Sequence, residues 1–283
     1  LEKAISIANN GRKGPVWIDI PLELQWSDIP FKKRKIIQKS KKYNLKLKSF
    51  TFMVQNSRKP LLVIGYGNRS LIDPKLLKSF VQANKIPFVT TWNACDIFPT
   101  NHPLNLGIIG MSGQRGANKS IFKSDLLICL GTHLSIPHTT TLYKTYAKNA
   151  KKIIINIDNN QLLNLNISFD LKILADLNSF YKALYKKKIK FKNEWENLSA
   201  LKQMNWYDPS KNNNINSNFA VREITRKIKN KCISIDGGGT ALYAGFQSSV
   251  IYKGDRVICS SAISSMGTGL AETIGVSKSN KFK

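Results

Sequence analysis

Short apolar runs alternate with amphipathic segments through the middle of the chain. Each run is short and ends in glycine or polar residues; the runs lie in PLLVIGYG, IPFVTTW, SDLLICLGTHL, KKIIINIDNN and DLKILAD. Near-continuous apolar runs of this kind are typical of parallel strands buried on both faces, and the segments between them predict the covering helices. The pattern predicts an α/β fold whose central part is a doubly wound parallel sheet, Rossmann-like in organisation.

Three flanking segments carry more specific predictions. GPVWIDIPL predicts a buried strand that ends at Pro21, because proline cannot continue a central ladder. The lysine-rich stretch 31–48 is interpreted as a linker. DPKLLKSFVQANK predicts a helix with Asp73 as N-cap and Pro74 at its first position.

A second unit begins after a helix-like segment, FKNEWENLSALKQMNW, and a polar tract, DPSKNNNINSN. The pattern then predicts the helix NFAVREITRKIKN, the strand CISID, the loop GGGT, the helix ALYAGFQSSV and the strand RVICSS. So few strands cover too little surface to close a doubly wound sheet. We therefore expect an incomplete second α/β domain.

Glycines and one carboxylate suggest a nucleotide site in the central part. Gly65 and Gly67 permit a tight turn and a close approach to a diphosphate, although the third glycine of GxGxxG is missing, and an ordinary strand-to-helix turn explains them equally well. Gly113 belongs to the segment GIIGMSGQRGAN. A loop so rich in glycine usually leaves room for a ligand or for the backbone of another subunit. Asp158 ends a strand and could accept a ribose hydroxyl or cap the next helix.

The segment ISIDGGGTAL gives the strongest local signal. Asp236 ends a strand, three glycines follow, and Thr240 stands at the expected helix start. Free backbone N–H groups and the positive end of a helix make a site for phosphate. A flexible turn is the alternative interpretation of the same residues.

Composition narrows the classes of function. The 283 residues are 42% hydrophobic, which suffices for one large or two ordinary domains, and no run reaches the length of a membrane span. The first residues lack the features of a secretory signal, so a cytoplasmic location is expected. The four cysteines have no CxxC spacing and are interpreted as small buried hydrophobic residues: Cys95, Cys129, Cys232 and Cys259.

The net charge of +27 points towards nucleic acid only if the basic residues are clustered. FKKRK, KSKKYNLKLK and YKKKIKFK lie in apparent linkers or helix ends, and lysine is abundant along the whole chain. No basic motif interleaved with aromatic residues and no zinc-finger spacing occurs. Nucleic-acid binding is therefore not favoured. If the chain did bind nucleic acid through these basic residues, its affinity would fall steeply as the salt concentration rises.

Taken in order, five segments resemble the thiamine-diphosphate-dependent enzymes of the acetolactate synthase type. They are GRKGPVWIDIPLELQ, PLLVIGYG, HPLNLGIIGMSGQRGANKSIFKSDLLICLGTHLS, IIINIDNNQ and ISSMGTGLAETIGV. The likeness to a branch associated with surface-polysaccharide gene clusters is closest around GQRGAN and LGTHLSIP. The resemblance spans nearly the whole chain.

The resemblance implies a division into three parts. Residues 1–38 match the tail of the pyrimidine-binding domain and a linker, and residues 39–188 match the central domain. Residues 189–283 match a second linker and the start of the diphosphate-binding domain, which is incomplete here. The family's active sites lie between subunits, so a homo-oligomer is expected of the intact enzyme.

The resemblance also implies roles for five residues. Gly238, Gly239 and Thr240 match the loop that lies against the cofactor diphosphate. The backbone of Ser264 matches the acceptor for the cofactor's 4′-amino group. Met266 matches the wedge that holds the cofactor in its bent form, a role that an unbranched, polarizable side chain suits; core packing is the alternative for this methionine.

Several departures from the family limit what the resemblance implies. The family usually has larger hydrogen-bonding side chains at Gly239 and Thr240, and Ala271 replaces a proline. THLSIPHTT lacks the arginine and acidic residues of the FAD-binding synthases, which puts FAD in doubt. The catalytic glutamate is expected upstream of Leu1, and the GDG motif with its asparagine, which binds Mg²⁺, is expected downstream of Lys283.

The residues therefore predict no catalytic or metal-binding group inside this chain. The three histidines have no obvious partner at catalytic spacing: His102, His133 and His138. We expect a fragment of a thiamine-diphosphate- and Mg²⁺-dependent carboligase or decarboxylase that acts on a small 2-oxo acid and is inactive alone. The alternative is a non-catalytic nucleotide-binding or structural module; neither hypothesis involves nucleic acid or a membrane.

Overall fold

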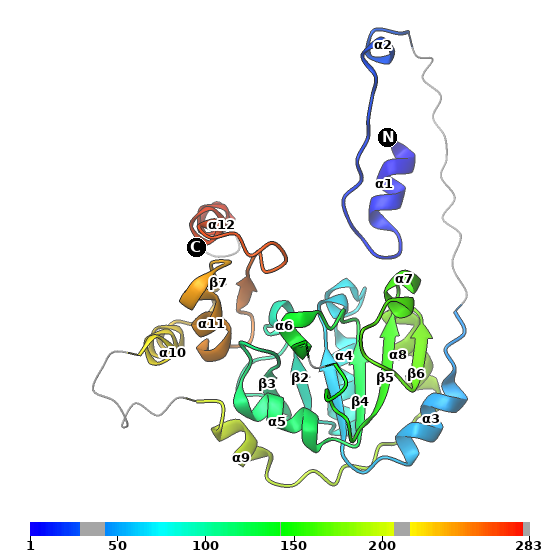
Figure 1. Cartoon of the computed structure of the whole chain (residues 1–283), viewed down its shortest axis with the longest axis vertical. Coiled ribbons are helices and arrows are strands. Elements are labelled where there is room, and N and C mark those ends of the chain that lie inside the picture. Colours follow the sequence, from blue (N-terminus) through cyan, green and yellow to red (C-terminus); the bar gives the residue numbers. More distant parts are fainter. Residues whose placement is uncertain (29–42, 142, 207–215, 280–283) are drawn as a thin grey trace.

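A six-stranded sheet in which every neighbouring pair is parallel forms the centre of the computed structural model, which describes residues 1–28, 43–141, 143–206 and 216–279 (Figure 1). Its strand order is β3-β2-β1-β4-β5-β6, the order typical of doubly wound dinucleotide-binding sheets. The predicted parallel α/β fold is confirmed. The strands are β1 (Pro60–Ile64), β2 (Phe88–Thr90), β3 (Asn105–Ile108), β4 (Leu126–Leu130), β5 (Lys151–Asn156) and β6 (Leu171–Leu174).

Helices cover both faces of this sheet, as the continuous apolar strands require. Leu62 and Ile64 of β1 pack in one buried cluster with three helices, whereas Leu61 and Val63 pack in a second cluster on the opposite face. The first cluster includes α3 (Leu47–Gln55), α4 (Lys75–Asn84) and α8 (Leu177–Lys187). The second includes α5 (Arg115–Lys123), α7 (Asn159–Leu163) and α9 (Leu198–Gln203).

Short elements complete the central part, one predicted boundary shifts, and one strand was not predicted. The 3₁₀ turns η1 (Tyr66–Ser70) and η2 (Trp92–Ala94) and the helix α6 (Ile136–Thr139) follow β1, β2 and β4. Helix α4 begins one residue later than predicted, with Pro74 as N-cap, and Asp73 Oδ1 accepts the Lys75 N–H at 2.9 Å. Strand β3 is not predicted by the pattern, because its four residues include Gly107 in a segment that reads as a glycine loop.

The helix expected over residues 191–206 is restricted to α9. Residues 191–197 instead run along the base of the sheet: Phe191 packs on the first cluster, and Trp195 Nε1 donates to the Pro60 carbonyl at 2.8 Å.

The N-terminal segment contains α1 (Glu2–Asn9) and α2 (Leu22–Gln25) and projects away from the sheet (Figure 1). The prediction of a buried strand in GPVWIDIPL is wrong, because this stretch has no strand partner among the described residues and the side chain of Trp17 is 91% exposed. Arg12 holds the segment to the central part through Asp158, at 2.9 Å. Most of the predicted lysine-rich linker, residues 29–42, lies outside the described residues.

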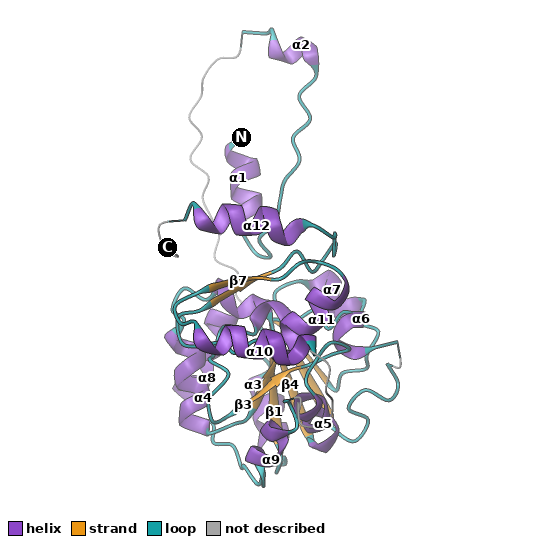
Figure 2. Cartoon of the chain, turned by 90° about the vertical axis from the view of Figure 1, so that its left-hand side faces the viewer, coloured by secondary structure: helices purple, strands orange, loops and turns teal. Residues whose placement is uncertain are grey.

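The described residues of the second unit form the two parallel strands and two helices that the sequence pattern predicts, and a third helix, α12. They are α10 (Ser217–Lys227), β7 (Cys232–Ser234), α11 (Gly239–Ser248), β8 (Arg256–Ile258) and α12 (Thr268–Ser277). The unit lies beside the β3 edge of the main sheet, with α10 and α11 nearer to that sheet than α12 (Figures 1 and 2). A two-stranded sheet is marginal alone, so its contact with the central part matters for its stability.

A shared core and a buried ion pair join the two units. Trp92 and Ile108 of the central part pack in one cluster with Phe246 and Val257 of the second unit. The carboxylate of Asp96 is 1% exposed and pairs with Arg69 and with Arg256, the latter at 2.6 Å. Its Oδ2 also accepts the Val257 N–H at 2.8 Å. These contacts fix strand β8 against the central part.

Two further findings bear on the composition. Cys95 and Cys129 are buried as predicted, whereas Cys232 and Cys259 are only partly buried. None of the helices in the described ranges combines the length and apolar character that a membrane crossing requires.

Candidate functional site

Two loops meet at the carboxyl edge of the β7–β8 sheet, and Asp236 joins them. Asp236 Oδ2 accepts the N–H groups of Gly267, at 2.8 Å, and Gly269, at 3.1 Å. Its Oδ1 accepts the Gly238 N–H at 3.2 Å. The bond from Gly269, together with those from Gly238 and Gly267, lowers the pKa of this carboxyl group, against the opposing effect of burial. The sequence pattern predicts Asp236 at the end of its strand but gives no signal of this link between the loops.

Glycine is required on the first loop because the second loop lies so close. A Cβ atom on Gly237 would stand 2.5 Å from the backbone carbonyl oxygen of Ser265. One on Gly238 would meet only the exposed Met266 side chain, 2.5 Å from its Cγ, and this side chain can move aside. Gly239 differs: it has a φ of +58°, and a Cβ there would meet nothing within 4 Å. The first turn of the ten-residue helix α11 therefore begins at open space, as a backbone anion site requires.

The second loop presents Ser264 and Met266 beside the glycines. Ser264 adopts a φ of +56°, a conformation that a non-glycine residue rarely takes without a tertiary reason. Met266 is 85% exposed even though its Cγ faces Gly238, so it packs in no core here. The structure thus brings the five predicted cofactor residues, Gly238, Gly239, Thr240, Ser264 and Met266, onto two touching loops; their contacts with a cofactor stay a prediction.

Replacing Asp236 by alanine should loosen the second loop without unfolding the chain. We expect amide hydrogen exchange at Gly267 and Gly269 to become about two- to tenfold faster, the factor that corresponds to one lost hydrogen bond. Because the folded pKa of Asp236 is lowered, its contribution is present above the unfolded pKa and is lost as the pH falls through the folded pKa. Unchanged exchange at both glycines in Asp236→Ala would contradict this assignment.

The predicted nucleotide residues of the central part lie against their own chain. A Cβ on Gly65 would be 2.3 Å from the Gly131 carbonyl oxygen, and one on Gly113 would be 2.4 Å from the Ile109 carbonyl carbon. Gly67 also abuts Gly131, with a Cβ distance of 2.9 Å to its Cα. These glycines permit close backbone packing, which is the alternative that the sequence left open; nucleotide contact at these residues stays a prediction.

Asp158 caps a helix. Its side chain accepts the N–H groups of Asn160 and Gln161 at the start of α7, and it also pairs with Arg12. The Arg12 guanidinium, with these backbone bonds, lowers the pKa of the Asp158 carboxyl group. Its second predicted role, at a ribose, is not tested by this arrangement.

Burial and local hydrogen bonds account for the positions of His138 and His102. Burial lowers the pKa of His138 to about 4, and its Nδ1 lies 3.1 Å from Ser135 Oγ. His102 Nδ1 accepts the Leu104 N–H at 3.3 Å, and burial, followed by the charge of Lys202, lowers its pKa. Within the described ranges, no group of three or more His, Cys, Asp or Glu side chains could hold a metal ion.

Comparison with known proteins gives a consistent picture. The family model described as thiamine pyrophosphate enzyme, central domain, matches residues 47–184. This stretch runs from the start of α3 into α8 and contains the whole six-stranded sheet.

The relatives share similarity along almost the whole chain. A probable acetolactate synthase large subunit of Methanocaldococcus jannaschii is 30% identical, over 96% of this chain and 49% of that protein. The acetolactate synthase large subunit of Buchnera aphidicola subsp. Schlechtendalia chinensis is 28% identical, over 98% and 51%. Acetolactate synthase 1, chloroplastic, of Zea mays is 27% identical, over 99% and 46%. The chain spans about half the length of these relatives.

Proposed function

Because the chain belongs to the thiamine pyrophosphate enzymes, with residues 47–184 as their central domain, we propose that it forms part of an acetolactate synthase-like carboligase or decarboxylase. The observation that carries the proposal is the meeting of the Gly237–Gly239 loop and the Ser264–Met266 loop over Asp236. Within this family, GQRGAN and LGTHLSIP favour the branch associated with surface-polysaccharide gene clusters.

The residues fit the cofactor in two respects. Gly239 leaves open space at the start of α11, so the first N–H groups of this helix and the Thr240 hydroxyl can face a diphosphate. Met266 is exposed beside Gly238 and can pack against a ring system. Thiamine diphosphate, when bound, supplies the electron sink for cleaving a 2-oxo acid. This chain's residues would position its diphosphate and support its rings.

We propose Mg²⁺ as the companion of the diphosphate and a homo-oligomer as the working form, in the cytoplasm. Exposed apolar side chains on the second unit support association: Leu270 and Ile274 of α12 are 73% and 56% exposed. With Met266 they place an apolar surface next to the candidate site, where burial against another subunit would be favourable. FAD has no supporting feature beyond the strand order of the sheet.

Residues 1–283 should show no turnover by themselves. The family's catalytic glutamate and its GDG motif match no residue of this sequence. Purified chain mixed with pyruvate, thiamine diphosphate and Mg²⁺ should release no carbon dioxide above the buffer background, measured with a coupled assay. A full-length acetolactate synthase serves as the positive control. Carbon dioxide release or acetolactate formation by the chain would contradict this prediction.

The strand order of the central sheet favours one alternative, a nucleotide-binding module. A ligand that binds the folded chain must raise its melting temperature, so the two hypotheses separate in thermal melts. We expect thiamine diphosphate with Mg²⁺ to raise the melting temperature, and FAD at the same concentration to leave it unchanged. The reverse result would favour the nucleotide-binding module.

A further inference from the structure

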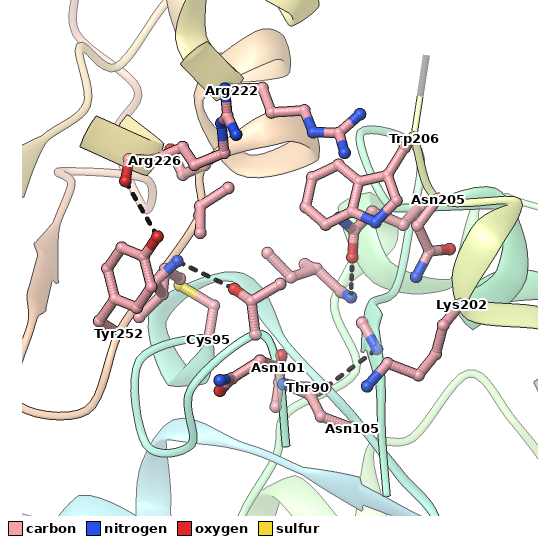
Figure 3. A pocket seen from close by; sticks show the side chains of 17 residues that line it. Thr90, Cys95, Asn101, Asn105, Lys202, Asn205, Trp206, Arg222, Arg226 and Tyr252 are labelled. Atoms are coloured by element: carbon pink, nitrogen blue, oxygen red, sulfur yellow. Dashed lines mark hydrogen bonds between the residues drawn. The ribbon is translucent and has the colours of Figure 1, made fainter. Parts of the chain in front are cut away.

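A cavity of about 300 Å³ lies at the seam between the central part and the second unit (Figure 3). Its walls come from the ends of β2 and β3, from the α9 region, from α10 and from residues 249–252 after α11. We call it the seam cavity. The volume is at the lower end of the range for small-molecule sites.

The seam cavity is distinct from the glycine loop. Residues 249–252 follow the carboxyl end of α11, whereas Gly239 begins that helix. The length of a ten-residue helix, about 15 Å, therefore separates the two places. No role proposed above for the cofactor uses this cavity.

The charged side chains of its wall are all basic. Arg222 and Arg226 are one turn apart on the same face of α10, and Lys202 of α9 stands across the cavity from them (Figure 3). No carboxylate occurs among the described residues that line it. Burial lowers the pKa of Lys202, because its ammonium group loses hydration at this seam.

The two arginines are held in place. The Arg222 guanidinium stacks over the Trp206 ring, 4.5 Å from its centroid, and makes no salt bridge with any residue the structure describes. Arg226 pairs with Glu223 at 2.6 Å, yet its side chain keeps 56% exposure. A planar guanidinium fixed in this way keeps N–H groups available in the fork geometry that phosphate oxygens match.

Two buried hydroxyls in the same wall point to a polar occupant. Thr90 and Ser249 are 1% and 4% exposed, and neither Oγ atom has a hydrogen-bond partner among the described residues. A buried hydroxyl without a partner costs free energy, so such groups are rare unless something else satisfies them. The wall also holds three aliphatic side chains, Ile108, Val250 and Ile251, beside several amides.

From these contacts we propose that the seam cavity binds a small phosphate ester. The phosphate group faces Arg222 and Arg226, and the organic part lies towards Ile108, Ile251 and the Trp206 ring. The ligand would touch both units at once, so its binding would also strengthen their contact. The proposal does not depend on the cofactor assignment.

Calorimetric titration of the whole chain with adenosine 5′-monophosphate, as a phosphate ester with a flat organic part, tests this proposal. We expect one site, and an affinity at least about tenfold weaker in Arg222→Gln and in Arg226→Gln, as expected when a charged hydrogen bond to the ligand is lost. Lys227→Gln, on the same helix but outside the cavity wall, is the matched control and should stay within about twofold of the wild-type chain, because an exposed charge contributes little. Equal melting temperatures of the variants establish that they are folded.

Two further titrations test which part of the ligand is recognised and which part of the chain binds it. Adenosine, which lacks the phosphate, should bind at least about tenfold more weakly than the monophosphate. Gly237→Ala should leave the affinity for the monophosphate unchanged. The proposal is overturned if the wild-type chain does not bind the monophosphate at millimolar concentration, if both arginine variants bind it as tightly as the wild type, if adenosine binds equally well, or if Gly237→Ala abolishes binding.

Discussion

Asp96→Ala is expected to lower the free energy of unfolding by about 3 kcal/mol, the lower end of the cost of breaking a buried ion pair. The carboxylate is 1% exposed, and its removal leaves Arg69 and Arg256 without their shared partner and the Val257 N–H without its acceptor. The arginine side chains retain 22% and 31% exposure, so solvent relieves part of their charge. Urea unfolding followed by circular dichroism measures the change.

Asp170→Ala is the matched control for this experiment. Asp170 pairs with Lys151 at 2.8 Å, but the lysine side chain is 73% exposed. Exposed pairs contribute about 1 kcal/mol or less. If Asp96→Ala and Asp170→Ala destabilise the chain equally, the ion pair at the junction of the two units does not hold them together as described.

Gly237→Ala is expected to weaken the binding of thiamine diphosphate at least tenfold. The physical reason is overpacking, which causes strain on the order of 1–3 kcal/mol. The added Cβ would lie 2.5 Å from the Ser265 carbonyl oxygen and 2.8 Å from the Ser264 carbonyl carbon. Both are backbone atoms, so the whole second loop must move away from the first. The rise in melting temperature caused by thiamine diphosphate with Mg²⁺ should disappear in this variant.

Gly275→Ala provides the control on the same unit. Gly275 lies inside α12, its φ is not positive, and a Cβ there would meet nothing within 4 Å. Alanine at a helical position of this kind is neutral or stabilising by about 0.5–1 kcal/mol. The response to thiamine diphosphate should therefore persist; its loss in Gly275→Ala as well would mean that the effect of Gly237→Ala is not specific to the loop contact.

Hydrophobic pattern predicted most of the fold because most strands are buried on both faces. β1 and β4 are fully buried and stand out as apolar runs, and the helices between them follow. β3 did not stand out because Gly107 interrupts it, and its place beside β2 depends on pairing that the local sequence does not encode. GPVWIDIPL has the composition of a buried strand, but burial requires a neighbour, and the described residues provide none.

The candidate site could be predicted only in part. The glycines and Met266 carry a local motif, and their resemblance to a family suggested that they meet. The spacing of residues could not predict the link through Asp236. Its carboxylate accepts the N–H groups of Gly267 and Gly269, which lie 31 and 33 residues further along the chain. The seam cavity had no sequence signal at all: Thr90, Arg222 and Ser249 come from separate elements, and only the docking of the two units places them in one wall.

Methyl nuclear magnetic resonance of the four methionines tests the central claim most directly. Met266 lies on the proposed cofactor loop, and Met111 lies between Gly110 and Gly113 of the central part, so the two report on different sites. The other two, Met53 and Met204, lie on neither loop, and Met266→Leu assigns the Met266 signal. We predict that thiamine diphosphate with Mg²⁺ shifts the Met266 methyl signal and leaves the other three unchanged. A Met266 signal that stays in place at saturating cofactor, or a shift confined to Met111, would contradict the account.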